Sequence, residues 1–208
     1  MKQVTKIKLC GMMKPQDVCT AMELNVDYVG FILTEGFKRT ITHETFCELE
    51  SYIHGSDSSN VKKVGVFVNE SIDNIIERYA DMLDVIQLHG KEDDKYITSL
   101  RQCTDKPIIK AFKITSAEDV QKANESIADY VLLDSGTGTG KTFDHTLVTG
   151  IDRPYFLAGG LTADNVADAI KSLHPYAVDA SSCLEIDGKK DSKKMMEFVN
   201  AVRGLLSI

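Results

Sequence analysis

A cysteine and an aspartate each follow a short apolar run, at positions from which enzymes commonly do acid–base chemistry. Cys10 comes directly after residues 7–9, and Asp134 comes directly after residues 130–133. A thiolate can remove a proton from carbon and a protonated carboxyl can donate one, so the two types together suit general acid–base catalysis. Each also has a purely structural interpretation, because a lone cysteine is often a small buried residue and an aspartate can hold a turn.

Glycine and serine residues at two later positions are suited to binding an anion. Gly159 and Gly160 follow residues 155–157, and Ser181 and Ser182 follow the last apolar run. Exposed backbone N–H groups beside the start of a helix favour phosphate. We therefore expect a phosphate cradle here, with a tight glycine turn that binds nothing as the alternative.

Arg39, His89 and Lys110 are further candidates with competing interpretations. Arg39 is either a binding residue or a solvated surface charge, and His89 either contacts a ligand or holds a loop. Lys110 lies within the apolar run 108–112, where an aldolase could place its Schiff-base amine. The sequence does not decide which face of the strand this lysine occupies.

The stretch 136–142 reads Gly-Thr-Gly-Thr-Gly-Lys-Thr and is similar to a nucleotide-binding loop. A P-loop requires a glycine five residues before the glycine of Gly-Lys-Thr, and Ser135 stands there. A dinucleotide fingerprint fails as well, because Lys141 replaces its third glycine. We expect instead a mobile loop that shields the site from water.

These candidates are distributed over a chain that alternates between two patterns. Short apolar or β-branched runs predict eight strands, at residues 7–9, 28–33, 64–68, 85–88, 108–112, 130–133, 155–157 and 176–178. The segments between them have helical spacing, with apolar side chains on one face of 72–79, 166–173 and 195–202. The segment 144–150 is the weakest of the expected helices. The expected helix starts are marked by Pro15 and by the N-cap residues Ser71, Ser116 and Thr162.

Strands that alternate with helices must pair in parallel, because the chain crosses over between neighbours. Eight such units in 208 residues leave 26 residues for each. The predicted fold class is therefore α/β, a (β/α)8 TIM barrel with eight parallel strands, forming one domain over residues 1–208. An open doubly wound sheet is the alternative. In a barrel the C-terminal ends of all strands share one face, so the candidate residues are expected to meet there.

The composition argues against several other classes of protein. Acidic residues outnumber basic ones by 31 to 24, and the net charge of −7 argues against nucleic-acid binding. No apolar run is long enough to span a membrane, and the N-terminal segment lacks the apolar stretch of a secretory signal. The five cysteines show no metal-ligand spacing, and their odd number fits free thiols in a reducing cytoplasm.

Five short motifs, in the same order along the chain, resemble the phosphoribosylanthranilate isomerase family of tryptophan biosynthesis. They are Lys-Leu-Cys-Gly at 8–11, Gln-Leu-His-Gly at 87–90, Gly-Thr-Gly-Lys-Thr-Phe-Asp at 138–144, Leu-Ala-Gly-Gly-Leu at 157–161 and Asp-x-Ser-Ser-x-x-Glu at 179–185, followed by Lys-Asp at 190–191. The resemblance covers nearly the whole chain.

The resemblance implies a cofactor-free isomerase that performs an Amadori rearrangement. N-(5-phosphoribosyl)anthranilate would become 1-(2-carboxyphenylamino)-1-deoxyribulose 5-phosphate, with Cys10 as the general base and Asp134 as the general acid. Arg39 corresponds to the family arginine that binds the anthranilate carboxylate, a planar match that suits a guanidinium.

The same resemblance extends to the rest of the substrate. It places Gly160 and Ser182 at the phosphate, Asp179 at a ribose hydroxyl and His89 among the substrate-binding residues, and it implies no metal. The expected partner is a phosphorylated small molecule, with no nucleic acid and no membrane, and the expected state is a monomer or homodimer in the cytoplasm.

The chain departs from the family pattern in three loops. Phe37 stands where serine is usual, Thr137 where glycine is common, His145 where tryptophan is common and Cys183 where glycine is usual. At Cys183 we expect a backbone that approaches the phosphate or has a positive φ. The alternative is that the loop has shifted and the thiol fills an apolar gap.

Three rival functions stay open on the sequence. A related isomerase of the histidine pathway would be expected to carry aspartate where this chain has Cys10. A Schiff-base aldolase would depend on Lys110. A non-catalytic phosphosugar-binding barrel would bind its ligand without turnover.

Overall fold

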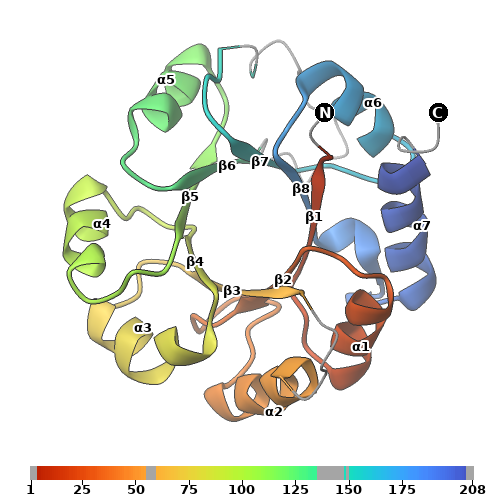
Figure 1. The fold of residues 1–208 in the computed structure, drawn as a ribbon, viewed down its shortest axis with the longest axis horizontal. Coiled ribbons are helices and arrows are strands. Elements are labelled where there is room, and N and C mark those ends of the chain that lie inside the picture. The colour runs from red at the N-terminus through yellow and green to blue at the C-terminus, as the bar shows by residue number, and fades with distance from the viewer. Residues whose placement is uncertain (1–3, 55–59, 135–147, 149, 205–208) are drawn as a thin grey trace.

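Eight parallel strands close into a barrel in the computed structural model, which describes residues 4–54, 60–134, 148 and 150–204 (Figure 1). The strands are β1 (Lys6–Cys10), β2 (Tyr28–Ile32), β3 (Lys62–Phe67), β4 (Val85–Leu88), β5 (Ile108–Lys113), β6 (Tyr130–Asp134), β7 (Tyr155–Ala158) and β8 (Ala177–Ala180). Closure is made by β8 pairing with β1, where Lys6 lies opposite Ala177. The (β/α)8 prediction is confirmed, and the open-sheet alternative is wrong.

Helices form a ring around the barrel (Figure 1). They are α1 (Pro15–Glu23), α2 (His43–His54), α3 (Ile72–Arg78), α4 (Asp94–Arg101), α5 (Ala117–Glu125), α6 (Val166–Leu173) and α7 (Ser192–Arg203), with short 3-10 turns at η1 (Ala80–Met82) and η3 (Ser182–Leu184). All eight expected strands and the three expected helical faces are found. The expected helix at 144–150 lies mostly outside the described residues.

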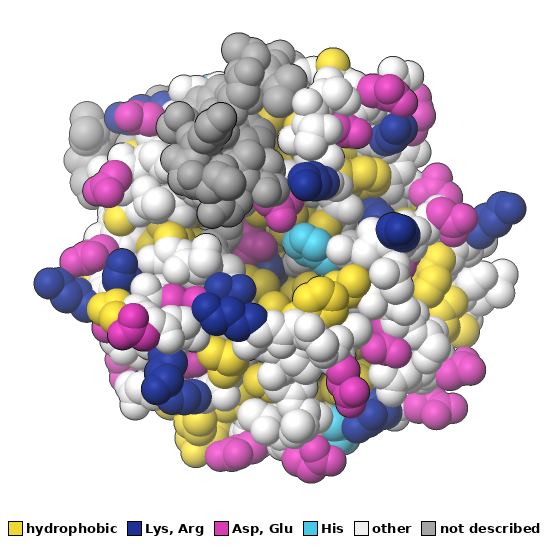
Figure 2. Space-filling view, turned by 180° about the vertical axis from the view of Figure 1, so that it is seen from behind, with side chains coloured by type: hydrophobic (Ala, Val, Ile, Leu, Met, Phe, Trp, Pro, Cys, Tyr) yellow, Lys and Arg dark blue, Asp and Glu magenta, His cyan; other side chains and the backbone are white. Residues whose placement is uncertain are grey.

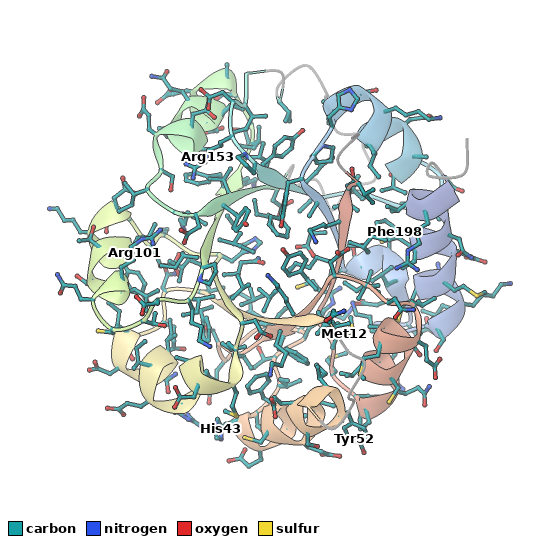
Figure 3. All side chains as sticks on the ribbon, in the orientation of Figure 1. Met12, His43, Tyr52, Arg101, Arg153 and Phe198 are labelled. Carbon is teal, nitrogen blue, oxygen red and sulfur yellow. The ribbon has the colours of Figure 1, made fainter. Side chains whose placement is uncertain are left out.

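Alternation along each strand separates two apolar layers. Side chains that point inward from neighbouring strands form one buried cluster, which includes Tyr28, Val64, Ile109 and Phe156. The alternate residues point outward and pack against the helices, where Phe198 of α7 is 1% exposed (Figure 3). Strand periodicity therefore also decides which residues can face the interior of the barrel.

Three of the four expected helix starts are confirmed. Pro15 is the first residue of α1, Ser71 accepts a hydrogen bond from the Asn74 N–H at 3.2 Å, and Ser116 is the N-cap of α5. The prediction for Thr162 is wrong, because α6 begins only at Val166. The Thr162 N–H donates instead to the Asn165 side chain at 2.8 Å, so a turn precedes the helix.

A small hairpin after β8 was not expected from the sequence. It pairs β9 (Glu185–Ile186) with β10 (Lys189–Lys190) in antiparallel fashion. Its two-residue loop has positive φ at both positions, 49° at Asp187 and 76° at Gly188. Asp-Gly is the residue pair that tight hairpins favour for this reason, so the signal was present in the sequence.

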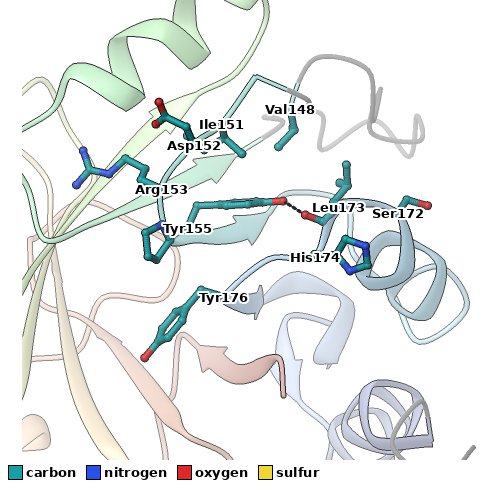
Figure 4. Close-up of a pocket in the computed structure, with 10 residues that line it drawn as sticks. Val148, Ile151, Asp152, Arg153, Tyr155, Ser172, Leu173, His174 and Tyr176 are labelled. Atoms are coloured by element: carbon teal, nitrogen blue, oxygen red, sulfur yellow. Dashed lines mark hydrogen bonds between the residues drawn. The ribbon is translucent and has the colours of Figure 1, made fainter. Parts of the chain in front are cut away.

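The end of the barrel where the strands begin is held by side-chain to backbone hydrogen bonds. A cavity of about 550 Å³ opens there beside the start of β7, and the Tyr155 hydroxyl donates to the Leu173 carbonyl at 2.6 Å (Figure 4). Arg153 donates to carbonyls at and beyond the end of α5, including those of Ser126 and Ala128. Residues at this end of a barrel usually serve stability.

We predict that Arg153→Ala lowers the free energy of unfolding by ~1–3 kcal/mol, the cost of leaving partly buried carbonyls without a donor. Arg101→Ala is the matched control. Its side chain is 39% exposed and pairs with Asp129 at 2.9 Å, and its one bond to a backbone carbonyl, that of Ile127 at 3.1 Å, is exposed so that water can replace it. Its loss should therefore cost under ~1 kcal/mol. Urea unfolding of both variants measures the difference, and equal losses would contradict this role for Arg153. Both arginines are labelled in Figure 3.

Candidate active site

A cavity of about 480 Å³ opens at the C-terminal end of the barrel. It is lined by the last inward-pointing residue of seven strands: Cys10, Ile32, Val66, Gln87, Asp134, Ala158 and Asp179. Figure 2 shows this face hollowed near its centre, where a histidine and acidic side chains lie beside hydrophobic ones. The volume suits a small phosphorylated molecule.

Cys10 lies at the floor of this cavity as a free thiol that is 7% exposed. Burial raises the pKa of the thiol above its ordinary value, because it disfavours the thiolate. The positive charges of Lys8 and Lys190 oppose this effect, whereas Asp179 adds to it. The thiol is therefore mostly protonated in the substrate-free protein at neutral pH.

A fully buried ion pair lies next to this thiol. Lys8 Nζ donates to Asp179 Oδ2 at 2.9 Å, and the lysine side chain is 0% exposed. Burial raises the pKa of Asp179, and Lys8 opposes that shift. Within the described part of the chain Asp179 Oδ1 has no hydrogen-bond partner, although it is buried. Asp179 itself lines the cavity, with one buried oxygen that no described residue satisfies.

Asp134 and His89 lie together on the opposite part of the wall. His89 Nε2 is 3.6 Å from Asp134 Oδ2, and Gln87 Nε2 lies 2.9 Å from His89 Nδ1. With Gln87 donating to Nδ1, the neutral imidazole carries its proton on Nε2, the nitrogen that faces the carboxylate. His89 is thus brought into the site beside the candidate acid.

Arg39 reaches the cavity from the loop after β2, but part of its guanidinium is already engaged. Nε and Nη2 donate to the two carboxylate oxygens of Glu185 at 2.5 and 2.9 Å. Glu185 also accepts from Lys190 Nζ at 2.8 Å, and the Lys190 side chain is 0% exposed. The interpretation of Arg39 as a solvated surface charge is wrong, since its side chain is only 19% exposed.

The glycine and serine residues expected to cradle an anion lie on one edge of the cavity. Gly159 and Gly160 have φ of 87° and 65°, a conformation that favours glycine. Asn165 donates to the Gly160 carbonyl at 2.9 Å and so holds the turn. Gly160 and Ser182 both line the cavity and are exposed to it.

The expectation of a positive φ at Cys183 is wrong. The residue lies within η3, and the described non-glycine residues with positive φ do not include it. Its side chain is partly buried and packs against the core, as the apolar-gap alternative expects, while a close approach of this backbone to the phosphate stays a prediction. Burial raises the pKa of Cys183 to about 11.

Lys110 does not reach the cavity. Its neighbours Ile109 and Ala111 belong to the interior cluster, so alternation points Lys110 outward, toward the helices. Its ammonium is 2.8 Å from both the Glu92 carboxylate and the Gly90 carbonyl. The Schiff-base aldolase interpretation is therefore wrong.

Four residues of this site, Lys8, Gln87, Glu185 and Lys190, received no role from the sequence. All four stand within or beside the family motifs, but nothing in one sequence says that their side chains converge. The expected loop at 136–142, together with Thr137 and His145, lies outside the described residues.

Two features are absent from the described part of the chain. No group of three or more His, Cys, Asp or Glu residues there could hold a metal ion. None of the described helices is long and apolar enough to cross a membrane.

Comparison with known proteins points to one family. The family model described as N-(5'phosphoribosyl)anthranilate (PRA) isomerase matches residues 7–201. The chain is 39% identical over 206 residues to N-(5'-phosphoribosyl)anthranilate isomerase of Endomicrobium trichonymphae, covering 96% of this chain and 99% of that one. A relative from Thermoanaerobacter sp. (strain X514) is also 39% identical, with coverages of 97% and 100%.

Solved structures agree with the sequence comparisons. Phosphoribosyl anthranilate isomerase from Thermotoga maritima superposes with a TM-score of 0.85 at 31% identity, covering 97% of this chain and 100% of that chain. The same enzyme type in complex with reduced 1-(o-carboxyphenylamino)-1-deoxyribulose 5-phosphate gives a TM-score of 0.82 at 30% identity, with the same coverages. The barrel fold and the matches over nearly the full length of the chain point to the same family. The chain belongs to the N-(5'-phosphoribosyl)anthranilate isomerase family.

Proposed function

We propose that this protein converts N-(5'-phosphoribosyl)anthranilate into 1-(o-carboxyphenylamino)-1-deoxyribulose 5-phosphate, with Cys10 as general base and Asp134 as general acid. The observation that carries the proposal is the meeting of a thiol and a carboxyl in one cavity of a chain from this family. An arginine and a glycine–serine edge complete the same cavity. The proposed reaction makes the enzyme an intramolecular oxidoreductase of tryptophan biosynthesis.

In the first step Asp134 donates its proton to the ring oxygen of the furanose. The bond between this oxygen and C1′ breaks, and the nitrogen lone pair forms a C1′=N bond. The product is an open-chain iminium ion. His89, with Nε2 3.6 Å from the carboxylate, orients Asp134 for this donation.

In the second step the Cys10 thiolate removes the proton from C2′. The C–H electrons form a C1′=C2′ bond, and the C=N electrons return to nitrogen, which gives an enolamine. Transfer of a proton from O2′ to C1′ then yields the ketone. Cys10 ends the sequence as a thiol and Asp134 recovers its proton from water, so atoms and electrons balance and the rearrangement needs no external oxidant or reductant.

The state of the thiol fits this order of events. Burial holds the pKa of Cys10 above its ordinary value before substrate binds. The iminium formed in the first step is a positive charge close to the thiol, and it favours loss of the thiol proton to water, which leaves the thiolate. Lys8 acts in the same direction from below the cavity.

Binding groups are available at each end of the substrate. A guanidinium matches the geometry of a carboxylate, so Arg39 binds the anthranilate end. Gly160 and Ser182 bind the phosphate through the edge that they form on the cavity. Asp179 lines the same cavity, and its carboxylate can accept from a ribose hydroxyl, which has a proton to donate.

A turnover assay tests the proposed function directly. Purified protein is mixed with freshly prepared phosphoribosylanthranilate, and the loss of anthranilate-type fluorescence is followed. A non-catalytic phosphosugar-binding barrel would bind the same compound without this change. Absence of turnover with intact binding would therefore overturn the proposal.

We further propose that the protein works in the cytoplasm as a monomer or homodimer. Five free cysteines support a reducing compartment. Every proposed site residue comes from one chain, so the site does not require a second copy. A related enzyme from Thermotoga maritima is described as dimeric, with monomers generated by mutation.

Replacing the acid or the base should affect kcat far more than KM. We predict that Cys10→Ala and Asp134→Asn each lower kcat by ~10²–10⁴, the range for lost general acid–base catalysis. KM should change little, because neither group is a main binding contact. Cys103→Ala is the control, since Cys103 is exposed and remote from the cavity. Steady-state kinetics measures both constants, and wild-type turnover by either variant would refute its assignment.

The raised pKa of Cys10 predicts slow alkylation at neutral pH. We expect iodoacetamide to label Cys10 with a pH midpoint above that of an ordinary thiol, since burial is the main influence and Asp179 adds to it. Lys8→Met should move the midpoint further up, because the ammonium favours the thiolate; Lys190 is retained in both proteins. Peptide mass spectrometry after timed labelling follows each cysteine separately, with exposed Cys103 as reference.

Thermal unfolding of the Lys8→Met variant shows whether it is folded at the temperature of labelling. A midpoint below that of an ordinary thiol in the wild-type protein would contradict the burial argument. An unchanged midpoint in a folded Lys8→Met variant would contradict the role of Lys8.

A further inference from the structure

One edge of the Arg39 guanidinium is occupied by Glu185, and among the described residues the other edge has no hydrogen-bond partner. Nε and Nη2 donate to the two oxygens of Glu185. A guanidinium has five N–H groups, of which these bonds use two. Both hydrogens of Nη1 and one of Nη2 are left, and one hydrogen from each of these nitrogens forms a second planar fork that fits a carboxylate. Arg39 lines the cavity.

Glu185 is itself held firmly in place. Its side chain is 5% exposed, and Oε1 accepts from Lys190 Nζ at 2.8 Å in addition to Arg39 Nε. The Lys190 ammonium also donates to the Ser181 carbonyl at 2.9 Å, and Ser181 Oγ donates to the Cys10 carbonyl at 3.0 Å. The hairpin that carries Glu185 and Lys190 is therefore tied to the end of β1.

The charges of this cluster suit a second anion. Burial alone would raise the pKa of Glu185, but hydrogen bonds from Arg39 and Lys190 hold it below its ordinary value, so the carboxylate is ionised. Arg39 and Lys190 then contribute two positive charges against one negative charge. A substrate carboxylate on the free edge of Arg39 would balance the cluster.

We propose that Glu185, anchored by Lys190, is a positioning residue that turns the free edge of Arg39 toward the anthranilate carboxylate. This inference deepens the proposed function and rests on its assignment of Arg39. Glu185 does not touch the substrate. It limits the rotation of a long side chain, so that less conformational freedom is lost when the substrate binds.

Binding of two matched compounds separates this role from a purely structural one. The first is the reduced product analogue, 1-(o-carboxyphenylamino)-1-deoxyribulose 5-phosphate after reduction. The second is the same compound without the carboxyl group. Titration calorimetry gives Kd for each with the wild-type protein, Glu185→Gln, Arg39→Ala and the double variant.

We expect Glu185→Gln to weaken binding of the carboxylated compound on the order of tenfold, the effect of about 1.4 kcal/mol. The Kd of the compound without the carboxyl group should stay within about twofold of the wild-type value. This compound has no carboxylate for Arg39 to bind, so the substitution removes no contact to it. In the Arg39→Ala background the Glu185 substitution should have no further effect, because its influence passes through Arg39. In turnover, KM should rise while kcat is preserved.

Glu50→Gln is the matched control for losing a partly buried ion pair. Glu50 accepts from Lys63 Nζ at 2.7 Å, and neither residue lines the cavity. Its substitution should leave both Kd values unchanged. If Glu185→Gln is too unstable to titrate, Glu185→Asp keeps the charge while withdrawing the oxygens by one methylene, and the same comparison is made with it.

The possible failures are distinguishable. If Arg39→Ala leaves Kd for the carboxylated compound unchanged, the proposed role of Arg39 fails. If Arg39→Ala weakens that binding but Glu185→Gln does not, the positioning role alone is refuted. Tighter binding by Glu185→Gln would mean that Glu185 competes with the substrate for Arg39, which also refutes it. An equal loss for both compounds would show general damage to the cavity rather than positioning.

Discussion

Closure of the barrel is the constraint on which the site depends. Once β8 pairs with β1, alternate residues of every strand must face a common interior. The interior below is filled by apolar side chains and the buried Lys8 side chain, so the last inward residue of each strand has only the open C-terminal end to face. Cys10, Asp134 and Asp179 are far apart in the sequence and line one cavity for this reason.

Buried charge gives this cavity its chemical character. The Lys8–Asp179 pair and the Arg39–Glu185–Lys190 cluster lie at its floor and wall, with little access to water. Interactions between charges are stronger where water is excluded. The cations beside Cys10 can therefore oppose the effect of burial on the thiol, and the cluster at Arg39 can keep an excess positive charge for an anionic substrate.

The polar groups at the two ends of the barrel differ in their role: those at one end stabilise the fold, and those at the other end form the proposed site. At the end where the strands begin, the side chains of Arg153 and Tyr155 donate hydrogen bonds to backbone carbonyls. At the other end, Gln87 and Asp179 each retain a buried acceptor that no described residue satisfies. Unsatisfied buried acceptors are costly inside a protein, and both belong to residues that line the proposed site.

Local patterns in the sequence determined the eight strands, the parallel barrel and most helix starts, because apolar periodicity depends on near neighbours alone. Motif resemblance identified the family and the candidate acid and base. Tertiary structure decided which way individual side chains point and which distant residues meet. It turned Lys110 outward, because the face of a strand depends on its pairing with neighbouring strands, and it put Cys183 into a short helix rather than a positive-φ turn. It also joined Arg39 to Glu185, which lies 146 residues further along the chain and is held by Lys190. Contacts between residues so far apart leave no periodic signal in one sequence.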